Sequence, residues 1–150
     1  MARNHEFINF SLLAIRQAIK NDSNFGTEND WPSICSAFNI FTESLIAHMN
    51  NEDSNCYNQA DLKTDCNPLF YRLISDHMNI RKLIGECQLQ INLNERSQFT
   101  IIFSQLDQLI EEHTIREENL MGLNANNLET STIQVIEALQ NIHINRSSKF

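Results

Sequence analysis

Two pairs of histidine and glutamate in this sequence have the residue types and the spacing needed to bind metal ions. His48 precedes Glu52 by four residues, and His113 precedes Glu117 by the same interval. Residues four apart share one face of a helix, so each pair can direct an imidazole and a carboxylate at the same point. This mixture of ligands suits iron, manganese or zinc, and it disfavours metals that prefer thiolates.

Each of four apolar stripes in the sequence carries one histidine, and these are His5, His48, His77 and His113. The apolar residues around them recur at intervals of three and four, which is typical of one face of a helix. The four predicted helices cover approximately residues 5–20, 31–57, 67–91 and 97–120. The short connections between them predict an all-α, up-down-up-down four-helix bundle. Residue counts from the turns place the four histidines at one level, because a mismatch of one residue is only about 1.5 Å of rise.

Few residues in the chain can break a helix, since it contains only three glycines and two prolines. Pro32 and Pro68 stand where the first turn of a predicted helix begins, and Gly122 follows the fourth helix as a stop signal. The bundle is therefore predicted to cover residues 1–123. A weaker amphipathic stretch follows, so residues 124–150 are expected to form a short fifth helix or a tail packed on the bundle.

The two glutamates fall on the apolar stripes, at positions that would lie in the core of the bundle. Burying an unpaired carboxylate costs several kcal/mol. Without a cation, burial is expected to raise the pKa values of Glu52 and Glu117. A lone histidine on a stripe is usually a hydrogen-bonded core residue, but four level histidines with two core glutamates favour divalent cations that compensate the carboxylates. His143 fits neither this level nor a stripe partner, so it is left outside the predicted site.

The six predicted ligands divide naturally into two sets that share the glutamates. One ion would take His5 and His48, the other would take His77 and His113, and both carboxylates would bridge the two ions. Neither set fills an octahedral coordination sphere, so water, oxide or dioxygen could enter. The sequence therefore predicts a dinuclear centre, with iron as the expected metal and manganese or zinc as alternatives.

The sequence segments that carry these residues resemble those of the hemerythrin-like, or HHE cation-binding, family. They are His5, HMNNE at residues 48–52, SDHMNIRKLI around His77 and HTIREENL from His113, which together span approximately residues 5–123. The resemblance implies a four-helix bundle with two iron ions, joined by an oxo or hydroxo bridge and by the glutamates. It also implies a centre that binds, senses or reacts with O₂, NO or peroxide.

Two departures separate the chain from the oxygen carriers of that family. The carriers have a second histidine one turn away on the third helix, where this chain has Leu73 and Arg81. They also use HxxxxD on the fourth helix, where this chain has HxxxE. Both differences place the sequence nearer to the bacterial HHE proteins. Arg81 is expected either to bring a positive charge near the centre or to be solvated.

Three functions remain open from the sequence. The first is a di-iron protein that senses or reacts with O₂ or a related small molecule. The second is a reversible O₂ carrier or storage protein, against which the missing histidine argues mildly because an under-coordinated iron tends to oxidise. The third is a helical interaction module that the metal only stabilises. No motif marks a substrate pocket or a second catalytic domain, so enzymatic activity is left open and no protein partner is predicted.

Composition and charge exclude several other classes of protein. Hydrophobic residues make up 41% and charged residues 20%, which is typical of a globular chain. The formal net charge of -8 disfavours binding to nucleic acid or to anionic membranes, because neither would gain from counterion release. The four cysteines form no CxxC pair, and the first residues lack the basic-then-apolar order of a signal peptide. The protein is therefore predicted to be cytoplasmic, with its thiols reduced.

Overall fold

Five α-helices make up the described part of the chain, which covers residues 3–25, 30–57, 67–122 and 130–148 of the computed structural model. At residues 3–7 this description extends to the helical backbone and not to the side chains. None of these helices combines the length and the apolar character that a membrane span requires. The helices are α1 (Arg3–Phe25), α2 (Asp30–Asn55), α3 (Asn67–Asn92), α4 (Arg96–Met121) and α5 (Thr130–Ser148).

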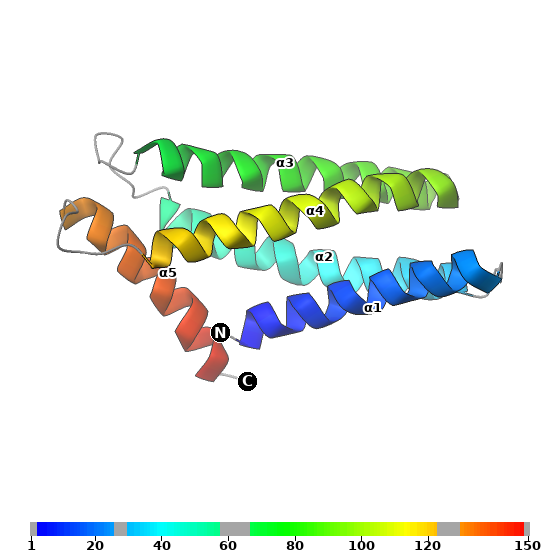
Figure 1. The fold of residues 1–150 in the computed structure, drawn as a ribbon, viewed down its shortest axis with the longest axis horizontal. Coiled ribbons are helices and arrows are strands. Elements are labelled where there is room, and N and C mark those ends of the chain that lie inside the picture. The colour runs from blue at the N-terminus through cyan, green and yellow to red at the C-terminus, as the bar shows by residue number, and fades with distance from the viewer. Residues whose placement is uncertain (1–2, 26–29, 58–66, 123–129, 149–150) are drawn as a thin grey trace.

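The first four helices lie lengthwise in two antiparallel hairpins, α1 with α2 and α3 with α4, and the hairpins pack side by side (Figure 1). α5 runs across one end of this bundle at a steep angle and contacts α1, α2 and α4. The predicted all-α, up-down-up-down bundle is confirmed, and so is the fifth helix. The boundary between residues 1–123 and 124–150 stays a prediction, because residues 123–129 lie outside the described residues.

A short turn joins α3 to α4 and sets the level at which their side chains meet. Asn94 has a φ of 56°, in the left-handed region that asparagine tolerates better than most residues with a side chain. Its N–H donates to the carbonyl of Ile91 at 3.0 Å, and the N–H of Glu95 donates to the carbonyl of Gln90 at 2.9 Å. These bonds satisfy two carbonyls at the end of α3. The Asn94 side chain accepts a 2.6 Å hydrogen bond from the Trp31 indole, which ties the turn to the start of α2.

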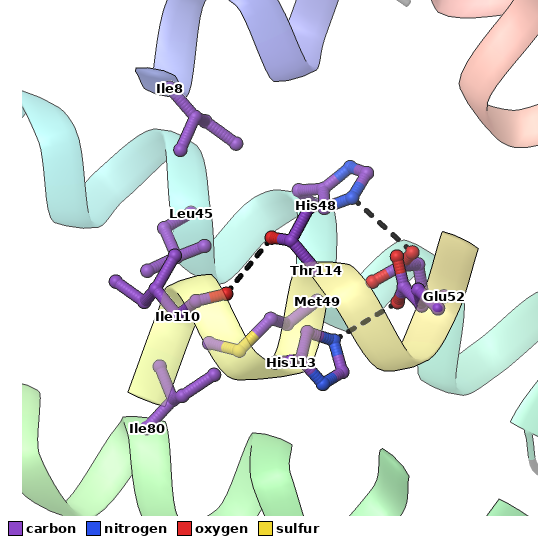
Figure 2. Close-up of a pocket in the computed structure, with 10 residues that line it drawn as sticks. Ile8, Leu45, His48, Met49, Glu52, Ile80, Ile110, His113 and Thr114 are labelled. Carbon is purple, nitrogen blue, oxygen red and sulfur yellow. Dashed lines mark hydrogen bonds and ion pairs between the residues drawn. The ribbon is translucent and has the colours of Figure 1, made fainter. Parts of the chain in front are cut away.

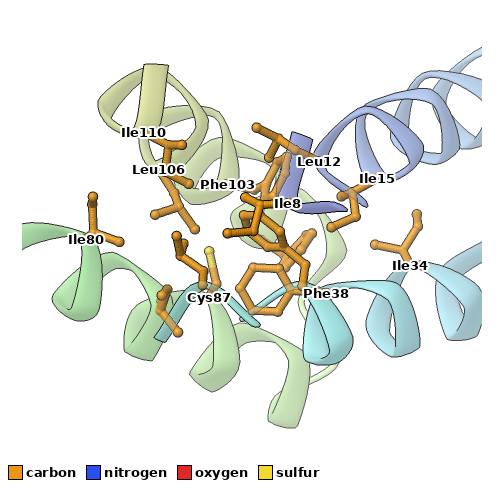
Figure 3. Close-up of a cluster of buried hydrophobic side chains, with 14 of the residues drawn as sticks. Ile8, Leu12, Ile15, Ile34, Phe38, Ile80, Cys87, Phe103, Leu106 and Ile110 are labelled. Carbon is orange, nitrogen blue, oxygen red and sulfur yellow. The ribbon is translucent and has the colours of Figure 1, made fainter. Parts of the chain in front are cut away.

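One apolar core runs from the middle of the bundle toward the turn between α3 and α4 (Figure 3). In its aromatic part, the ring of Phe38 meets those of Phe99 and Phe103 edge to face, with centroids 5.2 and 6.1 Å away. Such pairs contribute about 0.5–1.5 kcal/mol beyond the area that they bury. The buried members of this core are Ile8, Leu12, Ile15, Ile34, Phe38, Phe41, Leu45, Met49, Ile80, Ile84, Cys87, Phe99, Phe103, Leu106 and Ile110.

A second, smaller core closes the end of the bundle that α5 crosses. Its buried members are Cys56, Tyr57, Phe70, Leu73, Leu120, Val135, Ile136 and Leu139. Along α3 and α4, His77, His113 and Glu117 fall between the residues of the two cores, as Glu52 does on α2. His48 directly precedes Met49, the last residue of the first core on α2. The apolar contacts of the second core therefore hold α5 next to this polar layer.

Phe38→Ala should destabilise the bundle strongly, because this side chain is fully buried among aromatic neighbours. We expect the free energy of unfolding to fall by about 3–5 kcal/mol, from lost contacts and from the cavity left behind. Ile40→Ala is the matched control, since Ile40 lies on the same helix and is 55% exposed. It should change the free energy of unfolding by less than about 0.5 kcal/mol. Urea denaturation followed by circular dichroism measures both, and equal effects would contradict the packing described.

Candidate metal centre

Six buried histidine and glutamate side chains meet in the polar layer between the two cores. None of the six is more than 7% exposed. The i, i+4 spacing on α2 and on α4 places each glutamate one turn from its histidine, as the sequence predicts. The six are His48 and Glu52 from α2, His77 from α3, His113 and Glu117 from α4, and His143 from α5.

Three histidines approach the carboxylate of Glu52. Its Oε2 accepts a hydrogen bond from His143 Nε2 at 2.8 Å and lies 3.3 Å from His48 Nε2. Its Oε1 lies 3.3 Å from His77 Nε2, but no hydrogen bond reaches this oxygen. A buried carboxylate oxygen without a hydrogen bond costs free energy, and a cation at this position would remove that cost.

The carboxylate of Glu117 is held by a tyrosine and by two histidines. The hydroxyl of Tyr57 donates to Oε2 at 2.7 Å, and His113 Nε2 lies 3.0 Å from the same oxygen. His143 Nε2 lies 3.5 Å from Oε1. Burial, together with the charge of Glu117, raises the pKa of the Tyr57 phenol well above its usual 10. The phenol therefore remains a hydrogen-bond donor to Glu117 at neutral pH.

His77 and His113 turn their Nε2 atoms toward each other, at a distance of 3.1 Å. The Nδ1 atom of His77 is hydrogen-bonded to Asp53 at 2.7 Å, and that of His113 to Asp76 at 3.0 Å. An ionised carboxylate can only accept, so both Nδ1 atoms carry protons, and in neutral rings both Nε2 atoms present lone pairs. The two lone pairs face each other and also lie close to the carboxylates of Glu52 and Glu117. These groups repel one another unless a proton or a cation lies between them.

Each of these aspartates is in turn fixed by an arginine. Arg81 Nη2 lies 2.6 Å from Asp53 Oδ2, and Arg116 donates two hydrogen bonds of 2.8 Å to Asp76. Carboxylates that accept from the Nδ1 side of an imidazole fix its tautomer and its orientation, as they do around metal-bound histidines. Of the two expectations for Arg81, the structure supports the first, because its charge lies one aspartate away from His77.

The sequence analysis did not identify Asp53, Asp76 or Tyr57 as parts of the site. Asp53 directly follows Glu52, and Asp76 directly precedes His77, so both stand beside predicted ligands. Spacing along one helix could not reveal their roles, because each aspartate bonds a histidine that belongs to the next helix.

Protonated imidazoles can compensate the two carboxylates without a metal. Burial alone would raise the pKa of the Glu52 carboxyl, but the hydrogen bond from His143 and the nearby Nε2 atoms of His48 and His77 hold this pKa well below its usual 4.5. The expectation of a raised pKa for Glu52 was therefore wrong, because the imidazoles offset the charge that burial penalises. Burial alone would lower the pKa of His113, but its hydrogen bonds to Asp76 and Glu117 raise it to about 10.

Two overlapping groups of these side chains could hold a metal ion. Both glutamates belong to both groups, and the ligand atoms of each group lie within 4.8 Å of one another. The predicted pair of His77 and His113 is found in one group. The first group is His48, Glu52, Glu117 and His143, and the second is Glu52, His77, His113 and Glu117.

The position of His143 corrects the sequence analysis, which left this residue outside the site. Level counting applies to helices that run along the bundle, whereas α5 crosses the end of the bundle (Figure 1). His143 belongs to α5, so counting residues from the turns could not give its position. Its ring lies beside that of His48, with 5.2 Å between the centroids. A signal was present, because His143 follows the buried residues Val135 and Leu139 at intervals of four. The side chain of His5, predicted to pair with His48, lies outside the described residues.

A small cavity adjoins the two metal-binding groups (Figure 2). Its volume is about 30 Å³. A cavity needs roughly 10–15 Å³ to hold one water molecule, so this space suits one or two very small molecules. Thr114 and the apolar side chains of Ile8, Leu45, Met49, Ile80 and Ile110 line it together with His48, Glu52, His113 and Glu117.

Comparison with known proteins gives no relative, because no protein-family model, curated protein or solved structure matches the chain. The likeness to the hemerythrin-like family therefore rests on the motif residues alone. A functional assignment therefore depends on the chemistry of the six buried histidines and glutamates.

Asp76→Asn should lower the affinity for a divalent metal by about 10–100-fold, the usual effect of losing an outer partner of a metal-bound histidine. Asparagine keeps the size of the side chain but removes the charge that fixes the His113 ring. Competition against a fluorescent chelator with Zn²⁺ measures the affinity, and circular dichroism checks the fold. Asp107→Asn is the matched control, because Asp107 also pairs with an arginine, Arg16, and belongs to neither metal-binding group. Equal losses in both variants would rule out a positioning role for Asp76.

Proposed function

We propose that this chain is a hemerythrin-like protein whose dinuclear iron centre binds, senses or reacts with O₂, NO or a related small molecule. The observation that carries the proposal is the pair of overlapping ligand groups that share both glutamates, next to a small and mainly apolar cavity. When bound, iron would supply electron transfer to such a molecule.

The sharing of Glu52 and Glu117 supports two ions rather than one. Each carboxylate has two oxygens, and histidines approach both oxygens of both residues. His48 and His143 would hold one ion, while His77 and His113 would hold the other. With four protein ligands in each described group, neither ion would fill the six positions of an octahedron, which leaves room for a small molecule.

The surrounding chemistry favours iron or a similar metal over one that prefers sulfur. All ligands in both groups are imidazoles or carboxylates. Cys56 follows Glu52 by four residues and is buried, but burial and the charge of Glu52 raise the pKa of its thiol to about 12. At neutral pH this cysteine is therefore a neutral thiol and a poor metal ligand.

The size and lining of the cavity favour a diatomic molecule over a larger substrate. Pockets that bind organic ligands have volumes of about 300–1,000 Å³, whereas this cavity has about 30 Å³. Its apolar lining would accept an uncharged molecule without loss of hydrogen bonds and would limit the entry of water. The oxygen carriers have their extra histidine on the third helix. In this chain His143 brings a further imidazole to the cluster from α5, so reversible O₂ binding stays a second candidate.

A third candidate is a helical module that uses the metal only for stability, and one observation favours it. The carboxylate of Glu52 accepts a hydrogen bond from His143 and lies 3.3 Å from the Nε2 atoms of His48 and His77, which hold its pKa below the usual value without a metal. The bundle can therefore tolerate the cluster without metal. In that case the metal would add stability in proportion to its affinity for the folded chain.

Metal content tests the ligand assignment. Protein expressed with iron supplied should carry close to two ions per chain, one for each group. His143→Ala and His48→Ala should each bring this value toward one, because both residues belong to the same group. Gln140→Ala is the control on α5, since Gln140 donates to the carbonyl of Met121 and lies outside both groups. Full loading of the His143 variant would exclude this residue as a ligand, and a single ion in the unmutated chain would exclude the dinuclear centre.

Mixing the reduced, iron-loaded protein with O₂ separates the three candidates. We expect rapid conversion to the oxidised spectrum, because the open positions of the centre admit O₂. A spectral change that reverses when O₂ is removed would support a carrier instead. No change at all would support a metal that only stabilises the bundle. Zinc-loaded protein, which has no redox chemistry, is the control.

A further inference from the structure

A surface hollow lies between α1 and α4, next to the cavity that adjoins the metal-binding groups. Its volume is about 290 Å³, and it is lined by Leu12, Arg16, Ile110, Glu111, Thr114 and Ile115. Ile110 and Thr114 also line the inner cavity. These two side chains therefore form the wall between the hollow and the cavity.

The hollow and the cavity follow the same two helices from the surface inward. On α1, Ile8 lines the cavity, and Leu12, one turn later, lines the hollow. On α4, Ile115 lines the hollow directly after the wall residue Thr114. Ile115 is 51% exposed, whereas Ile8 is only 4% exposed. The surface hollow and the cavity beside the ligand atoms thus share the side chains of Ile110 and Thr114 as a common boundary.

We propose that this hollow is the mouth through which a small uncharged diatomic molecule, such as O₂ or NO, reaches the metal centre, and that Thr114 is its gate residue. The inference rests on the proposed function, since it requires a centre that reacts with such a molecule.

The local structure of Thr114 suits this role. Its Oγ1 donates a 2.9 Å hydrogen bond to the carbonyl of Ile110, one turn earlier on α4 (Figure 2). This bond and the β-branched side chain restrict the rotamers of Thr114, so the wall has a defined closed position. Because the hydroxyl donates within its own helix, it does not offer its proton to a water molecule in the cavity. In this proposal, a change in the rotamer of Thr114 opens the path past Ile110.

The lining of the path favours neutral molecules over anions. Arg16 lines the hollow, but its guanidinium is paired with Asp107, so its charge is already compensated. Glu111 adds a negative charge at the same rim. An anion would also have to leave its water shell at Ile110 and Ile8, because these apolar side chains cannot replace its hydration. The hollow is therefore an entrance and not an anion site.

Two substitutions of Thr114 test the gate in opposite directions. Reduced, iron-loaded protein is mixed with NO by stopped flow, and the association rate is divided by the measured iron content. We expect Thr114→Phe to slow association by about tenfold or more, because an added ring overpacks the passage. Thr114→Ala should raise the rate several-fold, because it removes both the methyl group and the bond to Ile110.

Thr100 offers a matched control on the same helix. Its Oγ1 donates to the carbonyl of Arg96, one turn earlier, at 3.0 Å, and it lines neither the hollow nor the cavity. Thr100→Phe and Thr100→Ala should leave the rate unchanged. Rates equal to that of the unmutated protein in both Thr114 variants, or equal shifts in the Thr100 variants, would overturn the gate and leave the proposed function standing.

Two further outcomes are decisive as well. If Thr114→Phe does not fold, Thr114→Ala alone decides, because an unchanged rate in that variant overturns the gate. If the unmutated, iron-loaded protein shows no spectral change with NO, the proposed function fails, and the gate fails with it.

Discussion

Two carboxylates in the middle of an apolar bundle are the constraint on which the rest of the structure depends. Glu52 and Glu117 are 1% and 2% exposed, and an uncompensated charge at such a position costs a large part of the stability of a domain. The side chains around them offset this cost, because they bring hydrogen-bond donors to the two carboxylates from four helices. The same imidazole nitrogens, once deprotonated, could bind a metal ion, so one set of atoms serves both the stability of the bundle and its candidate metal site.

The charges that orient this set are arranged from the surface inward. Arginines lie at the periphery, where Arg81 and Arg116 keep part of their surface in water, and each binds an aspartate. Each aspartate then holds the Nδ1 side of a histidine whose Nε2 faces the glutamates. Because the cationic groups stay partly hydrated, little desolvation cost is added. The imidazoles are nevertheless fixed before any metal arrives, which reduces the ordering cost of binding.

The apolar stripes with their level histidines were enough to predict the fold and the meeting of His48, His77 and His113 with both glutamates. They could predict this because each of these residues sits on a helix that runs along the bundle, where sequence position translates directly into depth. The position of His143 could not be predicted, because α5 crosses the end of the bundle. The angle of such a crossing depends on how the apolar surfaces of the helices fit against one another. The partners Asp53 and Asp76 were missed for a related reason, since their hydrogen bonds run between helices and leave no spacing pattern.

The crossing of α5 also has a consequence for the order in which the molecule is made. His143 follows Glu117 by 26 residues, so on a growing chain it is synthesised roughly 1–5 s after the fourth helix. The imidazole of His143 is therefore the last of the six buried side chains to be made. The polar layer between the two cores can be completed only after most of α5 has been synthesised.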